Sequence, residues 1–360
     1  MDGVDVAIVD VNGDACHVVH AHSRPYDPAL RAELFAAVAN PHSVALDRIG
    51  RLETALGEAF AAAIVGELRE AGISADRIAA IGSHGQTLRH APEGDLPFTW
   101  QIGDPNLIAE RTGIATVADF RRRDLAAGGE GAPLMPAFHR AVLGSTSEVR
   151  AVLNLGGIAN LTWLGRDGST FGFDTGPASC LMDGWIERHR GERYDSNGDW
   201  AASGRIDARL LERLLAEPYF ARPWPKSTGR ELFNMSWLDG HLGKAGKVAA
   251  EDVQATLCEL TAVSIAQAAA RAGAAARLIV CGGGTHNAHL LRRLGTHLPS
   301  LRIEPSSAHG VDPDFVEAAG FAWLASRTLA GKAGNIPSVT GARHAVVLGA
   351  LYPGTGVTRP

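Results

Sequence analysis

Apolar residues recur along this chain in two spacings. Alternating or continuous apolar runs between turn residues predict strands, whereas apolar residues three and four positions apart predict amphipathic helices. Residues 4–22 contain two such strand runs joined at Asn12-Gly13-Asp14, a turn sequence typical of a β-hairpin. Asp27-Pro28 opens a predicted helix that runs to Asn40, and a long amphipathic helix over 50–72 ends at Gly72. The chain therefore begins with a hairpin and two helices.

The pattern of the first half is repeated in the second. The first half continues with strands at 78–87 and 98–103, a helix at 105–111 and a strand at 115–120. The second half has a hairpin at 150–165, a strand at 170–176, helices at 180–190 and 251–273, a strand at 277–284, a helix at 286–295, a strand at 301–305 and a helix at 313–329. Each half is a hairpin, a long helix, a glycine-ended strand, a helix and a strand. This predicts two related α/β domains that face each other across a cleft.

The repeat also sets the expected domain boundaries. One domain is expected to comprise residues 1–125 together with 341–360, and the other residues 126–340. Residues 191–247 have no counterpart in the first half, so we interpret them as an insertion at the cleft.

Composition narrows the function classes. The chain has 360 residues, of which 46% are apolar and 20% charged, as is usual for globular proteins. Lys and Arg number 34 against 39 Asp and Glu, which gives a net charge of -5. Without a basic surplus, nucleic acid and anionic membranes are poor partners, and a small molecule is the expected one.

Cysteine usage and hydropathy indicate the compartment. The four cysteines, Cys16, Cys180, Cys258 and Cys281, have no CxxC spacing, which suits a reducing cytoplasm better than a disulfide framework. The first residues are acidic where a signal peptide would be basic, and no apolar run reaches the ~18 residues of a membrane span. We expect a cytoplasmic protein.

Glycine-rich turns follow several predicted strands. Residues 154–160 read NLGGIAN, residues 281–287 read CGGGTHN, and the chain opens with MDGVD. Backbone amides in such turns approach an anion closely because no side chain intervenes. No GxxxxGK[ST] motif occurs, so a P-loop is excluded, and no GxGxxG follows the first strand, which disfavours dinucleotide binding. Three glycine turns in a duplicated chain favour a nucleotide phosphate held between the domains.

Asp174 ends the apolar strand FGFDTGP at 171–177. A lone carboxylate is costly to bury, so it needs a partner or a task. One interpretation is that Asp174 caps the following helix, with Pro177 in the first turn. The other is that it acts as a general base. The residues alone do not separate the two.

Seven segments, in order and spread over nearly the whole chain, resemble the anhydro-N-acetylmuramic acid kinase family. They are residues 83–90, 101–139, 154–162, 172–185, 225–234, 281–287 and 335–342. The resemblance implies two duplicated actin-like, hexokinase-like (ribonuclease H-like) domains. It implies ATP and Mg²⁺ as cofactors and hydrolytic opening of 1,6-anhydro-N-acetylmuramic acid with phosphorylation of O6. The product would be N-acetylmuramate 6-phosphate in peptidoglycan recycling, and the enzyme a homodimer.

The resemblance also favours a role for particular residues. Asp174 becomes the expected base that takes a proton from the attacking water. The expected nucleotide-binding residues are Asp2, Gly3, Asn154, Gly156, Gly157, Asn160, Gly282, Gly283, Gly284 and Asn287. The expected substrate-binding residues are Ser83, His84, Gln86, Gln101, Arg122, Arg123 and Glu317. Arg122 or Arg123 would hold the lactyl carboxylate through its guanidinium fork, and Glu317 matches an acidic position of the family.

No metal ligand is expected, because His84, His90, His139 and His286 show no HxH or HExxH spacing among them. Lys226-Ser227-Thr228 looks like the end of a P-loop, but no glycine array precedes it, so we expect it to shape the insertion.

Two departures from the family pattern leave alternatives open. The family's first phosphate loop reads roughly Gly-Thr-Ser-x-Asp-Gly, of which this sequence shows Asp2-Gly3, and Ser179 stands where the family usually has Asn. A shortened loop would favour an inactive nucleotide-binding pseudo-kinase. The other alternative is an ordinary amino-sugar kinase that opens no ring.

Overall fold

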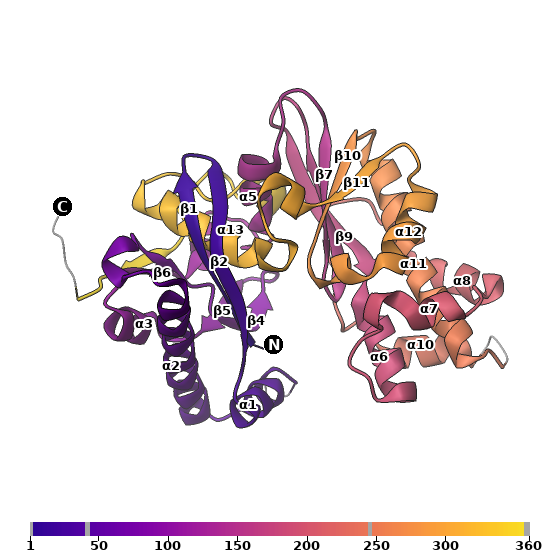
Figure 1. Cartoon of the computed structure of the whole chain (residues 1–360), viewed down its shortest axis with the longest axis horizontal. Helices are drawn as coiled ribbons and strands as arrows, with labels where there is room; N and C mark the ends of the chain where they lie inside the picture. Colours follow the sequence, from indigo (N-terminus) through magenta and orange to yellow (C-terminus); the bar gives the residue numbers. More distant parts are fainter. Residues whose placement is uncertain (1–2, 40–43, 244–246, 356–360) are drawn as a thin grey trace. The chain divides into compact units, whose positions relative to one another are not determined.

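The computed structural model describes residues 3–39, 44–243 and 247–355 (Figure 1). The chain divides into two compact units, Met1–Val142 with Phe315–Pro360, and Leu143–Asp314. The boundaries therefore differ from the expected ones at 125 and 340. Residues around 135–142 and 316–329 belong to the first unit because they pack on each other: the rings of Phe138 and Trp323 lie 6.0 Å apart.

The second unit is built on one five-stranded sheet. Its strands are β7 (Arg150–Leu155), β8 (Ile158–Leu164), β9 (Thr170–Pro177), β10 (Arg277–Cys281) and β11 (Arg302–Pro305). They lie in the order β11-β10-β7-β8-β9. The strands β7, β10 and β11 are parallel, while β8 is antiparallel to both β7 and β9. The predicted second hairpin and all the predicted strands of this half are confirmed.

Helices cover this sheet, and the side chains buried between the helices and the sheet form the core of the unit. The helices of the second unit are α6 (Ser179–Arg190), α7 (Asp199–Ser203), α8 (Ala208–Leu215), α9 (Pro218–Ala221), α10 (Met235–Leu242), α11 (Ala250–Ala272) and α12 (Ala288–His297). Leu153 and Leu161 of the sheet belong to one buried cluster with Trp185 of α6 and Leu257 of α11. The helices α7 to α10 make up the predicted insertion, and they belong to this unit.

The first unit contains three small sheets instead of one. The strands β1 (Gly3–Asn12) and β2 (Ala15–Pro25) form the predicted hairpin. The other strands are β3 (Ile81–Gly82), β4 (Gln86–Ala91), β5 (Phe98–Ile102), β6 (Thr116–Ala118) and β12 (Ala350–Tyr352). β12, β6 and β3 form one sheet, and β4 pairs with β5. The strand predicted over 78–87 is thus reduced to two short strands.

The helices of the first unit include the four predicted ones, and further helices at residues 120–126, 135–143 and 337–340 that were not predicted. The helices of this unit are α1 (Pro28–Ala39), α2 (Leu46–Ala71), α3 (Pro105–Thr112), α4 (Phe120–Ala126), α5 (Met135–Leu143), α13 (Val316–Leu329) and α14 (Pro337–Thr340). α2 ends, as predicted, at Gly72, which adopts a left-handed conformation with φ 67°. The order of elements repeats between the two units, but the sheet pairing does not. A cavity of about 620 Å³, lined by β1, α2, β3 and α13, separates the first hairpin from β3.

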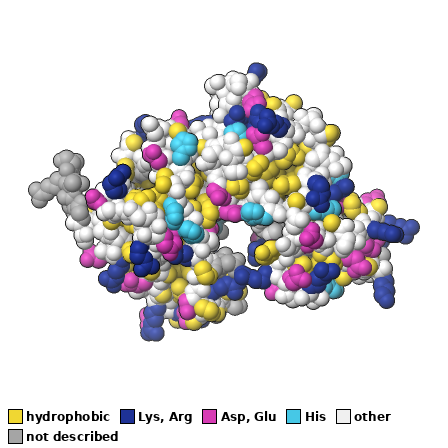
Figure 2. Space-filling model, in the orientation of Figure 1, with side chains coloured by type: hydrophobic (Ala, Val, Ile, Leu, Met, Phe, Trp, Pro, Cys, Tyr) yellow, Lys and Arg dark blue, Asp and Glu magenta, His cyan; other side chains and the backbone are white. Residues whose placement is uncertain are grey.

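The surface carries both kinds of charge, as the near balance of acidic and basic residues in the sequence suggests. On the face that Figure 2 shows, basic and acidic side chains are interspersed, and both signs occur throughout. Within the described ranges, no helix has the length and hydrophobicity that crossing a bilayer requires.

Candidate active site

Asp174 lies in a row of polar residues across the sheet of the second unit. Cys281 of β10 pairs with Asn154 of β7, Asn154 pairs with Asn160 of β8, and Asn160 pairs with Asp174 of β9. Residues paired in this way place their side chains on the same face of a sheet. Asp174 therefore shares one face with the two asparagines of the NLGGIAN segment.

The insertion holds Asp174 in place. The Thr228 amide donates to the Asp174 carboxylate at 3.0 Å, and the Asp174 amide donates to the Lys226 carbonyl at 3.1 Å. The buried Tyr219 hydroxyl donates to the Asp174 carbonyl at 2.7 Å. Sequence reasoning placed residues 226–228 in the insertion, but it did not connect them to Asp174. The hydroxyl of Thr228 is buried without a hydrogen-bond partner among the described residues.

The Asp174 carboxyl has an altered acidity. Burial raises its pKa to about 6, the hydrogen bond from the Thr228 amide opposes the rise, Glu231 adds to it and Lys226 opposes it. Burial also lowers the pKa of Lys226 to about 8, with Arg271 and Arg222 acting in the same direction. A carboxyl with a pKa near 6 is mostly ionised at neutral pH, yet it is more basic than an ordinary aspartate.

Asp174 does not cap the following helix. α6 begins after Ala178, and no side chain caps its first turn. Instead, the amides of Ala178 and Ser179 donate to the carbonyls of Gly157 and Gly156 at 3.0 and 3.1 Å. The capping interpretation is therefore wrong, because the glycine turn itself supplies the acceptors. Ser179 also donates to Asp183, a hydrogen bond that lowers the pKa of Asp183 against the effect of burial.

The second glycine turn lies beside the same row. Gly282 has φ 82° and ψ 167°, a conformation that essentially only glycine adopts. A Cβ there would meet the Asn154 side chain and, at 2.8 Å, the Leu155 carbonyl. A Cβ on Gly283 would meet nothing within 4 Å, whereas one on Gly284 would contact Leu155. Asn287 caps α12 through a 2.9 Å bond from the Leu290 amide, so its side-chain oxygen is already engaged.

Four of the predicted substrate residues line one cavity in the first unit. Ser83, His84, Gln86 and Glu317 border the 620 Å³ cavity, together with Asp5 of β1. Gln101 of β5 does not border it. The side-chain nitrogen of Gln101 donates to the Thr99 hydroxyl at 2.8 Å and to the Thr87 hydroxyl at 3.2 Å. The side-chain oxygen of Gln101 is buried without a partner among the described residues.

Arg121 joins this group, although sequence reasoning did not select it. The Arg121 guanidinium donates to His84 Nε2 at 2.9 Å and to the Gly131 carbonyl at 2.9 Å. Burial and the neighbouring Arg121 charge lower the pKa of His84 to about 3, so the imidazole is neutral at physiological pH. Its Nε2 accepts from Arg121, which leaves Nδ1 as the protonated nitrogen.

Glu317 has the opposite shift. The walls of the cavity shield it from bulk water and raise its pKa, while Arg121 lowers it and Asp5 raises it further. His84 and Glu317 thus place a neutral imidazole and a carboxyl in the cavity wall, and Arg121 donates to that imidazole.

Sequence comparison identifies the family. The chain matches anhydro-N-acetylmuramic acid kinase over residues 1–354. It is 54% identical to the anhydro-N-acetylmuramic acid kinase of Xanthomonas oryzae pv. oryzae over 98% of this chain and 94% of that protein. It is 52% identical to the enzyme of the same name from Xylella fastidiosa, over 98% of this chain and 93% of that one. This chain belongs to the anhydro-N-acetylmuramic acid kinase family.

Two solved structures share a low sequence identity with this family member. The (R)-2-hydroxyglutaryl-CoA dehydratase component A of Acidaminococcus fermentans is 13% identical, with a TM-score of 0.43 over 89% of this chain. A ROK family glucokinase from Streptomyces griseus is 16% identical, with a TM-score of 0.36. The family assignment depends on neither.

The remaining predicted residues of this anhydro-N-acetylmuramic acid kinase family member are more dispersed. Arg122 and Arg123 of α4 are exposed, and Arg122 lies 3.5 Å from Asp119. Gly3 begins β1 in the first unit, where a Cβ would meet the Arg24 carbonyl. Asp2 lies outside the described residues. Arg122, Arg123, Gly3 and Asp2 stay predictions.

One cluster was missed altogether. His20, His22 and Glu67 lie close together, with their ligand atoms within 4.8 Å of one another. The sequence signal was the HxH spacing of His20 and His22, which was not among the histidines considered above.

Proposed function

We propose that this protein phosphorylates 1,6-anhydro-N-acetylmuramic acid with ATP while opening its 1,6-anhydro bridge, and that Asp174 is the base. The product is N-acetylmuramate 6-phosphate, formed in peptidoglycan recycling. The family match favours this over the pseudo-kinase and over an ordinary amino-sugar kinase. One observation supports this role for Asp174. Its carboxylate is partly buried and oriented by the Thr228 amide, and burial raises its pKa to about 6.

The proposed reaction couples two bond changes. Asp174 takes a proton from water as the water oxygen bonds to the anomeric carbon, and the bond from that carbon to O6 breaks. O6 leaves with the electron pair and attacks the γ-phosphate, which releases ADP. A positioned base typically contributes ~10²–10⁴-fold to such a step.

Ring contacts are proposed for the cavity of the first unit. Ser83, Gln86 and neutral His84 offer hydrogen bonds to hydroxyl and acetamide groups. Arg121 is a further candidate for the lactyl carboxylate, because its guanidinium donates to His84, which lines the cavity, and to the Gly131 carbonyl.

The phosphates of ATP are proposed to lie along the glycine turns of the second unit. The row of Asn154 and Asn160 is flanked by the glycines Gly156, Gly157 and Gly282–Gly284. A Cβ on Gly283 would meet nothing within 4 Å, so there is room beside this residue for a phosphate. Magnesium, when bound with ATP, neutralises phosphate charge. The side-chain amide oxygens of Asn154 and Asn160 are hard oxygen ligands of the kind that Mg²⁺ prefers.

The Asp174→Asn variant tests the base. It keeps an oxygen to accept from the Thr228 amide but cannot accept a proton, so we expect kcat to fall at least ~100-fold with the fold intact. Asp167→Asn is the matched control, because Asp167 is an exposed aspartate hydrogen-bonded to Ser169 in the turn before β9. We expect that control to retain wild-type turnover.

The assay measures ADP release with anhydro-muramate, N-acetylmuramic acid and glucosamine as separate substrates. Near-normal turnover in Asp174→Asn would remove the base assignment. Phosphorylation of the open sugars alone would remove the ring-opening step and favour an ordinary amino-sugar kinase. We also propose a cytoplasmic homodimer, which cell fractionation and sedimentation equilibrium measure directly.

A further inference from the structure

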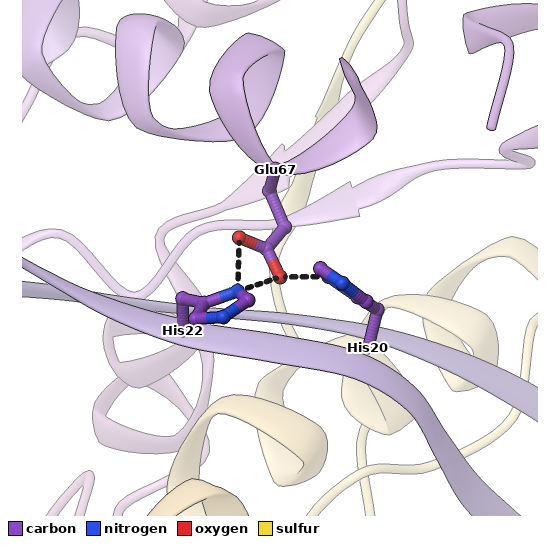
Figure 3. A group of neighbouring side chains, drawn as sticks. All are labelled: His20, His22 and Glu67. Atoms are coloured by element: carbon purple, nitrogen blue, oxygen red, sulfur yellow. Dashed lines mark hydrogen bonds and ion pairs between the residues drawn. The ribbon is translucent and has the colours of Figure 1, made fainter. Parts of the chain in front are cut away.

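A polar cluster joins the first hairpin to α2 away from the residues assigned above. His20, His22 and Arg24 alternate along β2, so they lie on one face of that strand. Glu67 of α2 faces the two histidines (Figure 3). Its side chain is completely buried, at 0% exposure, whereas His20 and His22 are 29% and 53% exposed.

One carboxylate oxygen is shared by the two imidazoles. His20 Nδ1 lies 2.6 Å from Glu67 Oε1, and His22 Nδ1 lies 3.2 Å from the same oxygen (Figure 3). The ligand atoms all lie within 4.8 Å of one another. Around a tetrahedral ion with bonds of about 2.0–2.1 Å, ligand atoms stand roughly 3.4 Å apart. Side-chain shifts of about 1 Å would therefore place all three around one ion.

The second carboxylate oxygen contacts His22 as well as Arg24: His22 Nδ1 lies 3.3 Å from Glu67 Oε2. Arg24 Nη2 donates to Glu67 Oε2 at 3.1 Å and to Glu70 at 2.8 Å. Arg24 thus helps to orient the carboxylate that the histidines contact, as outer-shell groups do for metal-ligating carboxylates. With neutral imidazoles, Glu67, Glu70 and Arg24 sum to one negative charge, which favours a cation.

We propose that His20, His22 and Glu67 bind a divalent transition-metal ion, with Zn²⁺ as the fitting representative. Two imidazoles and a carboxylate suit zinc and its neighbours, whereas Mg²⁺ and Ca²⁺ prefer oxygen ligands alone. The half-exposed His22 gives the ion a path from solvent. This site uses none of the residues proposed for the kinase chemistry, although Glu67 borders the same cavity as the proposed sugar contacts.

The ion would fasten the hairpin to α2. The hairpin and β3 share no hydrogen-bonded pairing, and a cavity lies between them. Glu67 also borders that cavity. Metal binding is therefore expected to stabilise the hairpin and one wall of the cavity, since an ion that binds the folded state alone raises its stability.

Zinc titration of the full-length, tag-free, chelator-treated protein tests the site. We expect calorimetry to give one equivalent of Zn²⁺ bound, and Co²⁺ to bind with visible absorption bands that Zn²⁺ abolishes. Excess Mg²⁺ should not compete. His20→Ala and His22→Ala should each weaken Zn²⁺ binding at least about tenfold. His17→Ala is the matched control, because His17 is an exposed histidine of the same strand.

Thermal unfolding supplies a second readout that does not depend on activity. Zinc should raise Tm for the wild type and for His17→Ala, but not for His20→Ala or His22→Ala. No saturable binding to the wild type would overturn the proposal, and so would binding that both histidine variants retain. A loss in only one of the two variants would overturn the three-ligand set. Each of these results leaves the kinase proposal untouched.

Discussion

At the scale of single residues, the acidity of Asp174 has a consequence for activity. A base works only when deprotonated, and burial raises the pKa of Asp174 to about 6. We therefore expect kcat/KM to be constant above about pH 7 and to fall about tenfold per pH unit below pH 6. Activity is lost toward acidic pH because protonation removes the base. An aspartate with an ordinary pKa of ~4 would stay deprotonated, and so active, to lower pH.

A pH profile of kcat/KM for anhydro-muramate, with coupling enzymes present in excess at each pH, measures this. A profile that stays flat down to pH 5 would show that the titrating group is not the base. For the Asp174→Asn variant, the residual kcat/KM should no longer fall below pH 6.

Arg121 carries a separate prediction. Arg121→Gln removes the guanidinium that donates to His84 and opposes the charge of Glu317. Because His84 and Glu317 line the proposed sugar cavity, we expect kcat/KM for the sugar to fall at least about tenfold, with little change in KM for ATP.

Arg111→Gln is the matched control. Arg111 pairs with Glu58 at 2.7 Å, but both side chains are about half exposed, and such surface pairs contribute little to stability. Steady-state kinetics and Tm of both variants separate a binding defect from unfolding. Wild-type kcat/KM in Arg121→Gln would remove this arginine from the sugar site.

At the scale of elements, the turn after β10 depends on one glycine. Gly282→Ala would force alanine into φ 82° and ψ 167° and press its Cβ on the Asn154 side chain. We expect a loss of at least about 2 kcal/mol in the free energy of unfolding and weaker ATP binding. Gly295→Ala in α12 meets nothing within 4 Å and should stabilise by about 0.5–1 kcal/mol. Urea unfolding and ATP calorimetry measure both, and equal stabilities would contradict the strain argument.

Most elements could be predicted because their signals are local. The Asn12-Gly13 turn, the Gly72 helix end and the apolar spacing of α11 are all readable within a few residues. The sheet pairing of the first unit was not, because β6 pairs with β3 and with β12, which lie far from it in sequence. The same holds for Asp174: its strand was predicted, but its contacts with Tyr219 and Thr228 join positions 45 and 54 residues apart.

At the scale of the whole molecule, the two units differ in how the chain builds them. The unit Leu143–Asp314 is one continuous segment, whereas the other needs Phe315–Pro360 to return to Met1–Val142. The expected boundaries at 125 and 340 were drawn from the internal repeat, which cannot show that α5 and α13 pack together. The Phe138 and Trp323 contact is the part that only the structure supplies.

This difference predicts how fragments behave. A fragment of residues 143–314 contains the whole five-stranded sheet and its buried cluster, so we expect it to fold alone with a cooperative thermal transition. A fragment of residues 1–142 lacks α13, whose Phe321 and Trp323 are buried, and should expose apolar surface and bind a hydrophobic dye. Circular dichroism, dye fluorescence and calorimetry of both fragments measure this. A molten 143–314 fragment, or a cooperative 1–142 fragment, would show that the two units do not form around separate cores.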